Sequence, residues 1–170
     1  MKMEKIYCLE NYIANGPTKS IELYEREKIL LRGASGCGKS LSLQKIANIN
    51  HIPQLPIRSK CYKNFSVSYS AQRYWALGKN IIEEITFFAK KGKINKEAIT
   101  NASYASFITE EKSYKELVNH EWNKIGTYNL SGGQLKRLSV ARSLYNNSEV
   151  ILLDEPTASV QKTMKAEIIK

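Results

Sequence analysis

Apolar and polar residues alternate in three stretches of this chain, which is the period of a β-strand with one buried face. Residues 20–24 and 65–71 alternate regularly. Residues 2–13 alternate less regularly, because Leu9 is one step out of register. We expect a strand in each of these stretches.

Two short runs are apolar at every position. Residues 29–31 (Ile-Leu-Leu) precede a glycine-rich stretch, and residues 150–153 (Val-Ile-Leu-Leu) precede an Asp-Glu pair. We expect a strand at 29–32 that leads into the glycine-rich stretch. A wholly apolar run such as 150–153 is typical of a strand buried on both faces.

Apolar residues take helical spacing in 41–47 and in 135–145, and Asn146-Asn147 breaks the second of these patterns. Pro53 and Pro56 predict a loop between the first helix and the strand at 65–71. The stretch from 78 to about 126 is helical in pattern throughout, and we expect a small inserted helical subdomain; the alternative is that its helices belong to the main core. The apolar faces of this subdomain lie at 81–89, 98–105 and 114–122. A further helix is expected from about 162, at the end of the chain.

The glycine-rich stretch fits the phosphate-binding pattern G-x-x-x-x-G-K-[ST] between an expected strand and an expected helix. Its glycines let backbone N–H groups converge on one point, at which the following helix aims its positive end. Lys39 would add a charge near the β- and γ-phosphates, and the Ser40 hydroxyl suits Mg²⁺. The alternative is a Gly/Ser turn without a ligand. The candidate nucleotide-binding residues here are Gly33, Ala34, Ser35, Gly36, Cys37, Gly38, Lys39, Ser40 and Leu41.

An Asp-Glu pair at the end of a buried strand fits a second element of a nucleotide site. Asp154 would hold Mg²⁺, usually through water, opposite the Ser40 hydroxyl. Glu155 would orient and deprotonate the water that attacks the γ-phosphate. Taken alone, such a pair is more often a polar turn, and the upstream phosphate-binding pattern reverses that interpretation.

The chain carries a net charge of +10, which is compatible with a nucleic-acid or anionic-membrane surface. Its lysines are spread along the sequence, so a solvated basic surface is favoured over a nucleic-acid groove. The 3 cysteines show neither paired nor metal-type spacing, as expected for reduced thiols. No apolar run approaches transmembrane length, so any membrane role is expected to act through a partner.

Four motifs in order give this chain a resemblance to the ATP-binding cassette (ABC) ATPases. They are the stretch 33–40, Gln72 at a strand end, Leu-Ser-Gly-Gly-Gln at 130–134 followed by Arg137, and residues 150–156. The Ser-Gly-Gly-Gln signature is the specific part, because phosphate-binding loops occur in many NTPases. The resemblance covers nearly the whole chain.

The resemblance implies a role for each matching residue. Gln72 matches a glutamine that senses Mg²⁺ and the attacking water, near the membrane partner, and with Lys39 and Glu155 it makes the candidate catalytic set. The implied metal ligands are Ser40, Gln72 and Asp154. The signature residues, which contact the γ-phosphate of ATP held by another subunit, are Ser131, Gly132, Gly133 and Gln134.

The local chemistry of the signature agrees with that role. Ser131 can cap the helix that follows, and Gly132 and Gly133 leave the backbone N–H groups bare for an anion. An ordinary helix start is the alternative. Tyr12 is the nearest candidate for the aromatic residue that stacks on adenine, although a core or surface tyrosine fits its surroundings equally well.

The implied fold is α/β, a P-loop NTPase core of the ABC ATPase type. It has a mainly parallel sheet, a small N-terminal antiparallel β part and an inserted helical subdomain. We expect a single domain over 1–170, incomplete at its C-terminus, with a β-rich phosphate-loop part at 1–77, the helical subdomain at 78–129 and the signature and Asp-Glu part at 130–170.

The implied cofactors are ATP and Mg²⁺. The implied partners are a second cassette, paired head to tail over two nucleotides, and a transmembrane permease subunit; no nucleic acid is expected. The protein would then lie peripherally at the cytoplasmic face of the cell membrane. The segment from Trp75 to Glu84 is similar to that of exporter-type cassettes, which favours export.

The chain departs from the family pattern after the Asp-Glu pair. Where the family has an aspartate that ends a small-residue loop, this chain has Gln161. The family's switch histidine is missing, because His51 and His120 both precede the pair. A central strand is also expected to be missing, so we expect a truncated cassette, or one completed by another polypeptide, with poor stability and little ATPase activity alone.

Two other functions remain open from the sequence. One is a soluble ABC ATPase that acts on nucleic acid or ribosomes, which the basic charge permits. The other is an ATP-binding remnant that does not hydrolyse ATP. Transport is favoured over the first because the chain has neither a second cassette nor a long coiled coil.

Overall fold

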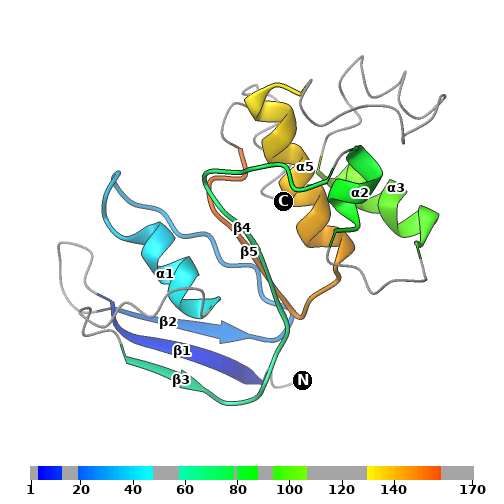
Figure 1. The fold of residues 1–170 in the computed structure, drawn as a ribbon. Coiled ribbons are helices and arrows are strands. Elements are labelled where there is room, and N and C mark those ends of the chain that lie inside the picture. Colours follow the sequence, from blue (N-terminus) through cyan, green and yellow to red (C-terminus); the bar gives the residue numbers. More distant parts are fainter. Residues whose placement is uncertain are drawn as a thin grey trace. The chain divides into compact units, whose positions relative to one another are not determined.

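The computed structural model describes residues 4–12, 19–47, 58–78, 80–87, 94–106 and 130–157. The chain divides into two compact units, Met1–Val67 and Ser68–Lys170 (Figure 1). The stretch 33–40 belongs to the first unit, and the other three motifs belong to the second.

The first unit contains a three-stranded antiparallel sheet in the order β2-β1-β3. Its strands are β1 (Lys5–Tyr12), β2 (Lys19–Tyr24) and β3 (Arg58–Cys61). The predicted strands at 2–13 and 20–24 and the antiparallel N-terminal part are thereby confirmed.

Strand β1 is the central strand, and this position explains its irregular pattern. Four consecutive residues, Ile6, Tyr7, Cys8 and Leu9, are buried, so both faces of the strand are covered. The pairing with β2 shifts register on either side of residues 7–9. The out-of-step Leu9 therefore belongs to a strand that is packed on two sides.

Strand β3 is not predicted by the sequence, in which Pro53 and Pro56 indicate only a loop. Its residues, Arg-Ser-Lys-Cys, include no large apolar side chain. It is an edge strand, held by backbone pairing with β1 in which Cys8 lies opposite Lys60. Pairing of this kind leaves no hydrophobic pattern in the sequence.

The predicted strand at 29–32 is wrong. Residues 27–34 have no regular secondary structure, and Ile29 and Leu30 are 41% and 51% exposed. A strand exists only when a neighbour pairs with its backbone, and no described residue pairs with this run. The helix that follows the glycine-rich stretch is present as α1 (Lys39–Ile46), and it contacts β1.

The second unit contains a two-stranded sheet of β4 (Val67–Ser70) and β5 (Val150–Leu153), both predicted. The Ser68 and Ser148 hydroxyls are 2.8 Å apart near the start of both strands. The Asp154 N–H donates to the Ser70 carbonyl, at 2.9 Å, where both strands end. Like ends lie together, so the strands are parallel.

Strand β5 is less buried than its apolar sequence predicts. Val150 and Leu152 are buried, whereas Ile151, on the other face, is 37% exposed. The expectation of burial on both faces is therefore wrong for Ile151. No helix or strand of the described residues covers that face fully.

The helices of the second unit are α2 (Ile81–Ile85), α3 (Lys96–Ala105) and α5 (Gly132–Tyr145). Helices α2 and α3 both pack on α5 (Figure 1). The side-chain oxygens of Asn80 and Asn95 accept backbone N–H bonds at the starts of α2 and α3. The buried cluster consists of Ile81, Ile85, Ile99, Leu138 and Ala141.

Helix α5 ends where the sequence predicts. Asn146 is its C-cap, and Asn147 follows in the left-handed conformation with φ 47°. The helices expected at 114–122 and from about 162, together with Gln161 and the two histidines, lie outside the described residues.

Candidate functional site

The stretch 33–40 has the backbone of a loop that can surround an anion. Gly36 and Gly38 lie in the left-handed region with φ 77° and 91°, which residues with a side chain rarely adopt. A Cβ on Gly33 would lie 2.7 Å from the Cys37 Sγ, so the loop is closely folded at its first position. The pattern requires Gly33 and Gly38, whereas Gly36 takes one of its free positions.

Helix α1 begins directly after this loop. Its N-cap is Gly38, which provides no side-chain cap, and the first turn contains no acidic residue. The N–H groups at the start of a helix need an acceptor, and their positive end attracts anions. The start of α1 is thus compatible with a phosphate group as its cap.

Lys39 lies over the loop itself. Its Nζ donates to the carbonyl oxygens of Gly33, at 3.0 Å, and of Ala34, at 2.8 Å. It also lies 3.7 Å from the Cys37 Sγ. The ammonium is therefore at the mouth of the loop, where it can exchange bonds to neutral carbonyl oxygens for bonds to negatively charged phosphate oxygens.

Asp154 lies in the second unit and is 3% exposed. The Tyr69 hydroxyl donates to its Oδ2 at a long 3.3 Å, which leaves carboxylate lone pairs for another ligand. Glu155 is exposed and has the left-handed φ of 49°. Such a conformation in a residue other than glycine costs about 1–3 kcal/mol and requires support from its surroundings.

The signature residues build a capping box at the start of α5. The Gln134 N–H donates to the Ser131 Oγ at 3.3 Å, and the Ser131 N–H donates to the Gln134 Oε1 at 2.7 Å. The predicted capping role of Ser131 is confirmed. A Cβ on Gly132 would meet nothing within 4 Å, so the backbone there is open to an approaching group.

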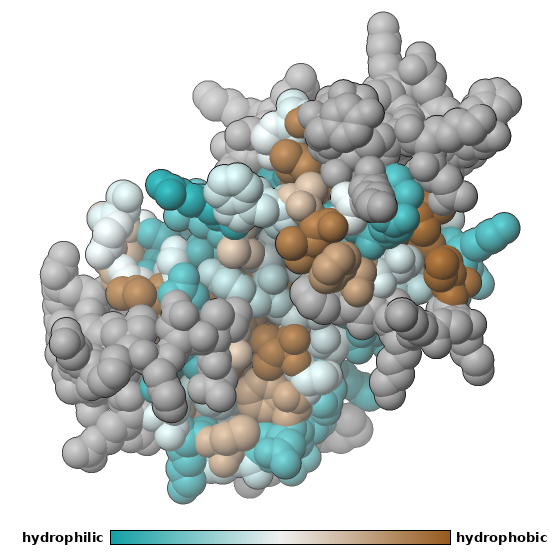
Figure 2. Space-filling view, in the orientation of Figure 1, coloured by the Kyte–Doolittle hydropathy of each residue, from teal (hydrophilic) through white to brown (hydrophobic). Residues whose placement is uncertain are grey.

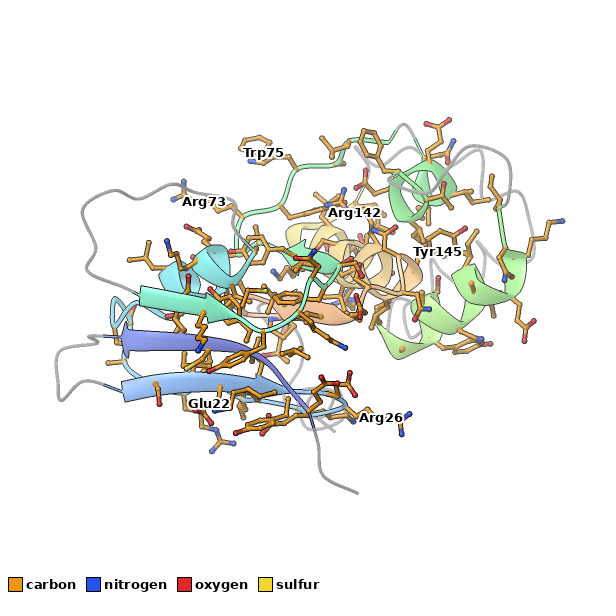
Figure 3. All side chains as sticks on the ribbon, turned by 90° about the horizontal axis from the view of Figure 1, so that it is seen from below. Glu22, Arg26, Arg73, Trp75, Arg142 and Tyr145 are labelled. Carbon is orange, nitrogen blue, oxygen red and sulfur yellow. The ribbon has the colours of Figure 1, made fainter. Side chains whose placement is uncertain are left out.

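Gln72 is exposed at the start of the segment 71–78, which we call the Gln72 segment. The indole of Trp75 in this segment is 80% exposed. Figure 3 shows Arg73 and Trp75 pointing away from the ribbon. The segment thus presents polar and aromatic side chains to the outside, while its backbone is held from inside the second unit.

One residue that holds this segment, Lys136, was missed by the sequence analysis. It is 4% exposed, and its Nζ donates to the carbonyl oxygens of Ala71, at 2.5 Å, and of Asp154, at 2.6 Å. Burial lowers the pKa of Lys136 to about 8, opposed by the charges of Asp154 and Glu155. Nothing in the local sequence distinguishes it from a surface lysine, because its partners lie far away along the chain.

Glu84 was also missed, and it holds the far end of the segment. This carboxylate is fully buried; its Oε1 lies 2.7 Å from the Arg142 Nη1 and accepts from the Tyr74 hydroxyl. Its Oε2 accepts from the N–H groups of Leu77, at 2.6 Å, and Gly78, at 2.5 Å. An acidic residue three positions after Ile81, on an apolar helix face, was the available signal.

Arg142 completes this network from α5. Its guanidinium carbon lies 4.9 Å from the centre of the Tyr74 ring, and Figure 3 shows it within the second unit. Burial lowers the pKa of Arg142, and Glu84 opposes the shift. The network gives a buried charge both an ionic partner and hydrogen bonds.

The residues present fit ATP and Mg²⁺. Mg²⁺ is usually bound through one or two carboxylates together with substrate phosphates and water. In the second unit the buried Asp154 carboxylate is an oxygen donor of that kind, and the first unit contains the Ser40 hydroxyl. The described residues hold no cluster of three or more potential metal-ligating side chains. Tyr12 is the last residue of β1, and its side chain lies outside what the structure describes.

The chain matches the ABC transporter family over residues 18–158. It is similar to the lactococcin-G-processing and transport ATP-binding protein LagD of Lactococcus lactis subsp. lactis, with 29% identity over 163 residues. The phosphate import ATP-binding protein PstB of Thermotoga maritima is 28% identical over 190 residues. The spermidine/putrescine import ATP-binding protein PotA of Acetivibrio thermocellus is 30% identical over 164 residues.

The lengths matched differ between these relatives. The alignments cover 89%, 99% and 88% of this chain, but 23% of LagD, 75% of PstB and 43% of PotA. A solved ABC transporter, described as of the metal-chelate type and inward-facing, matches with a TM-score of 0.61 and 20% identity. That match covers 96% of this chain and 65% of the other, and it shows the fold.

Fold and motifs together define a P-loop NTPase of the α/β class with an antiparallel N-terminal sheet. The chain belongs to the ABC transporter family, in its ATP-binding part, as its motifs predict.

Proposed function

We propose that this chain binds Mg-ATP and hydrolyses it as the nucleotide-binding subunit of a transporter. The observation that carries the proposal is the loop 33–40, whose two left-handed glycines open onto an uncapped helix with Lys39 at its start. Gly38 and Lys39 are residues that the phosphate-binding pattern requires, and Gly36 adds a second left-handed position.

The chemistry proposed for the site is positioning and charge stabilisation, which phosphoryl transfer mainly needs. Lys39 would neutralise phosphate charge, and Ser40 and Asp154 would supply oxygen ligands to Mg²⁺. Glu155 would orient the attacking water and accept its proton, and Gln72 would sense Mg²⁺ and that water. Bound Mg²⁺ supplies further stabilisation of the developing charge.

A second cassette is proposed to complete the site. The signature residues Ser131–Gln134 would contact ATP bound by the partner chain. The open space beside Gly132 and the anion-attracting start of α5 support this role. Each ATP then lies between the two chains, so both are needed for turnover.

The proposed partner in transport is a separate membrane subunit. No helix among the described residues is long and apolar enough to cross a membrane. Two exposed apolar side chains, Trp75 and Leu77, lie in the Gln72 segment and favour a partner contact there. A third, Phe87, follows helix α2. Figure 2 shows apolar side chains in separate groups among polar ones on the face in view. This chain would then lie peripherally at the cytoplasmic face of the membrane.

We propose export as the direction of transport, on the similarity of the segment from Trp75 to Glu84 to exporter-type cassettes. PstB and PotA are named as import proteins, and LagD is named for processing and transport. These names do not favour one direction. Nucleotide-driven uptake of substrate into inside-out vesicles would support export, and uptake into right-side-out vesicles would overturn it.

The first experiment is Mg-ATP binding by the 170-residue chain and its Lys39→Ala variant. The variant loses a charge-assisted contact to phosphate, so we expect affinity to fall about tenfold or more. Lys45→Ala, in the last turn of the same helix, is the matched control and should bind as the unchanged chain does. Equal affinities in all three proteins would contradict the proposal.

The net charge of +10 is the observation that favours the second candidate, a non-transport ABC ATPase that acts on nucleic acid or ribosomes. Such a protein would bind RNA or DNA with an affinity that falls steeply with added salt. Binding retained at physiological ionic strength would place this candidate first. A third candidate, an ATP-binding remnant, would bind Mg-ATP normally but show no turnover even when paired.

A further inference from the structure

The ammonium of Lys136 links two parts of the chain that the proposed reaction needs. Its bond to the Ala71 carbonyl holds the peptide that leads into Gln72. Its bond to the Asp154 carbonyl holds the peptide that leads into Glu155. A third contact, at 3.4 Å, reaches the Ser70 hydroxyl.

The Lys136 contacts lie at the C-terminal ends of two neighbouring strands. Ser70 and Leu153 end the parallel strands β4 and β5, and the chain reaches the surface two residues later, at Gln72 and Glu155. Asp154 is buried, whereas Gln72 and Glu155 are exposed. Lys136 thus bonds the carbonyl of the residue that directly precedes each exposed side chain.

The conformation of Glu155 needs such a support. Its φ of 49° is unfavourable for a residue with a side chain. On the N-terminal side of this residue, Asp154 is fixed by its N–H bond to the Ser70 carbonyl and by the Lys136 bond to its own carbonyl. A buried ammonium bonded to carbonyl oxygens is a strong restraint, because neither partner is hydrated there.

We propose that Lys136 is a positioning residue, which sets Gln72 and Glu155 relative to each other by holding the peptides that precede them. Because Lys136 lies on α5, two residues after Gln134, any movement of the signature helix is transmitted to both peptides. The expected effect on catalysis rests on the proposed function, whereas the restraint of the two peptides rests on the contacts of Lys136 alone.

The test is hydrogen exchange of the full chain, measured by mass spectrometry on peptides that cover 71–73 and 154–156. In Lys136→Met the two carbonyls lose their donor, so exchange of the Asp154 N–H, whose bond to the Ser70 carbonyl joins the two strand ends, should rise at least tenfold, while 131–135 stays unchanged. Lys136→Arg keeps charge and donors and should restore most of the protection. If Lys136→Met fails to fold, Lys136→Gln, with a shorter neutral donor, replaces it.

Ser139→Ala is the matched control. Ser139 also lies on α5 and bonds the Ser70 hydroxyl, at 2.6 Å, but its hydroxyl bonds neither the Ala71 nor the Asp154 carbonyl. We expect no rise in exchange at 71–73 or 154–156 in this variant. Equal exchange in Lys136→Met and the unchanged chain, or equal loosening in Ser139→Ala, would overturn the proposal.

Turnover separates positioning from stability. In the paired, ATP-loaded protein, Lys136→Met should lower kcat about 100-fold, as expected for a misplaced reacting group, with KM for ATP changed less than about twofold. Failure of the proposed function has a different signature, because Lys39→Ala would then leave ATP binding unchanged. Loosened peptides with unchanged kcat would overturn the catalytic part of the inference.

Discussion

At the scale of single residues, left-handed backbone occurs both at turns and at Glu155, the candidate catalytic residue. Among the described residues other than glycine, three have positive φ: Arg26, Asn147 and Glu155. Asn147 ends a helix, where asparagine is commonly tolerated. Arg26 and Glu155 pay a conformational cost, and only Glu155 has a proposed role that can explain it.

Arg26 offers a direct test of that cost. The Glu27 N–H bonds to the Tyr24 carbonyl, so Arg26 with φ 60° takes the third position of a type II turn, which favours glycine. We expect Arg26→Gly to raise the free energy of unfolding by about 0.5–1 kcal/mol, measured by urea denaturation. Arg26→Ala removes the same charge without relieving φ, and an equal gain in that variant would contradict the explanation.

Gly78 and Gly132 are a matched pair with opposite surroundings. A Cβ on Gly78 would lie 2.5 Å from the Glu84 backbone nitrogen, whereas one on Gly132 would meet nothing within 4 Å. We expect Gly78→Ala to lower the free energy of unfolding by about 1–3 kcal/mol, because backbone must move. Gly132→Ala should change it by less than about 0.5 kcal/mol, since its site is exposed. Similar unfolding midpoints for both variants would show that the contact at Gly78 is not restrictive.

At the scale of elements, helix α5 is the common partner of most of the second unit. Its residues 136–143 are all buried, and they contact β4, β5, α2 and α3 through both apolar and charged groups. The polar contacts fix α5 against both ends of the Gln72 segment. The signature helix and this segment are therefore expected to move together.

The Glu84–Arg142 pair allows this linkage to be measured. Glu84→Ala leaves Arg142 buried without its ionic partner, so we expect the free energy of unfolding to fall by about 3–5 kcal/mol. Chemical denaturation of the full chain gives the value. Adding Arg142→Met to Glu84→Ala removes the stranded charge and should recover part of the loss. A double variant less stable than the sum of the two single effects would contradict a paired role.

At the scale of the whole molecule, the motifs are divided between two units that the structure describes separately. The phosphate-binding loop belongs to the first, and Gln72, the signature and the Asp-Glu pair belong to the second. The Lys136 and Glu84 contacts act within the second unit alone. We expect all four motifs to contact nucleotide only when ATP is bound and two chains are paired.

Pairing of two chains is tested with a variant that binds ATP without consuming it. Glu155→Gln removes the proposed proton acceptor but keeps the size of the side chain, so bound ATP should persist. If each ATP is contacted by both chains, its persistence stabilises the pair by mass action. We expect Mg-ATP to shift this variant from one chain to two in light scattering. A mass unaffected by Mg-ATP, with ATP bound, would contradict the shared site.

The sequence alone predicts most features that are formed by bonds between residues a few positions apart. The glycines of 33–40, the capping box of Ser131 and Gln134, and the end of α5 at Asn146 all follow from bonds that span a few residues. The pattern predicts a strand at 29–32 that the structure does not contain, and it gives no sign of the strand that the structure does contain at 58–61. Pairing with distant backbone decides a strand, and that information is not local.

The sequence by itself determined the family, the phosphate-binding loop and the signature, because each is a short pattern whose residue types carry the chemistry. Only the tertiary structure decided which charged residues support that chemistry. Lys136 meets Ala71 and Asp154 across 65 and 18 positions, and Glu84 meets Arg142 across 58. These charges lose their hydration on folding, so each is tolerated only because the fold brings a distant partner to it.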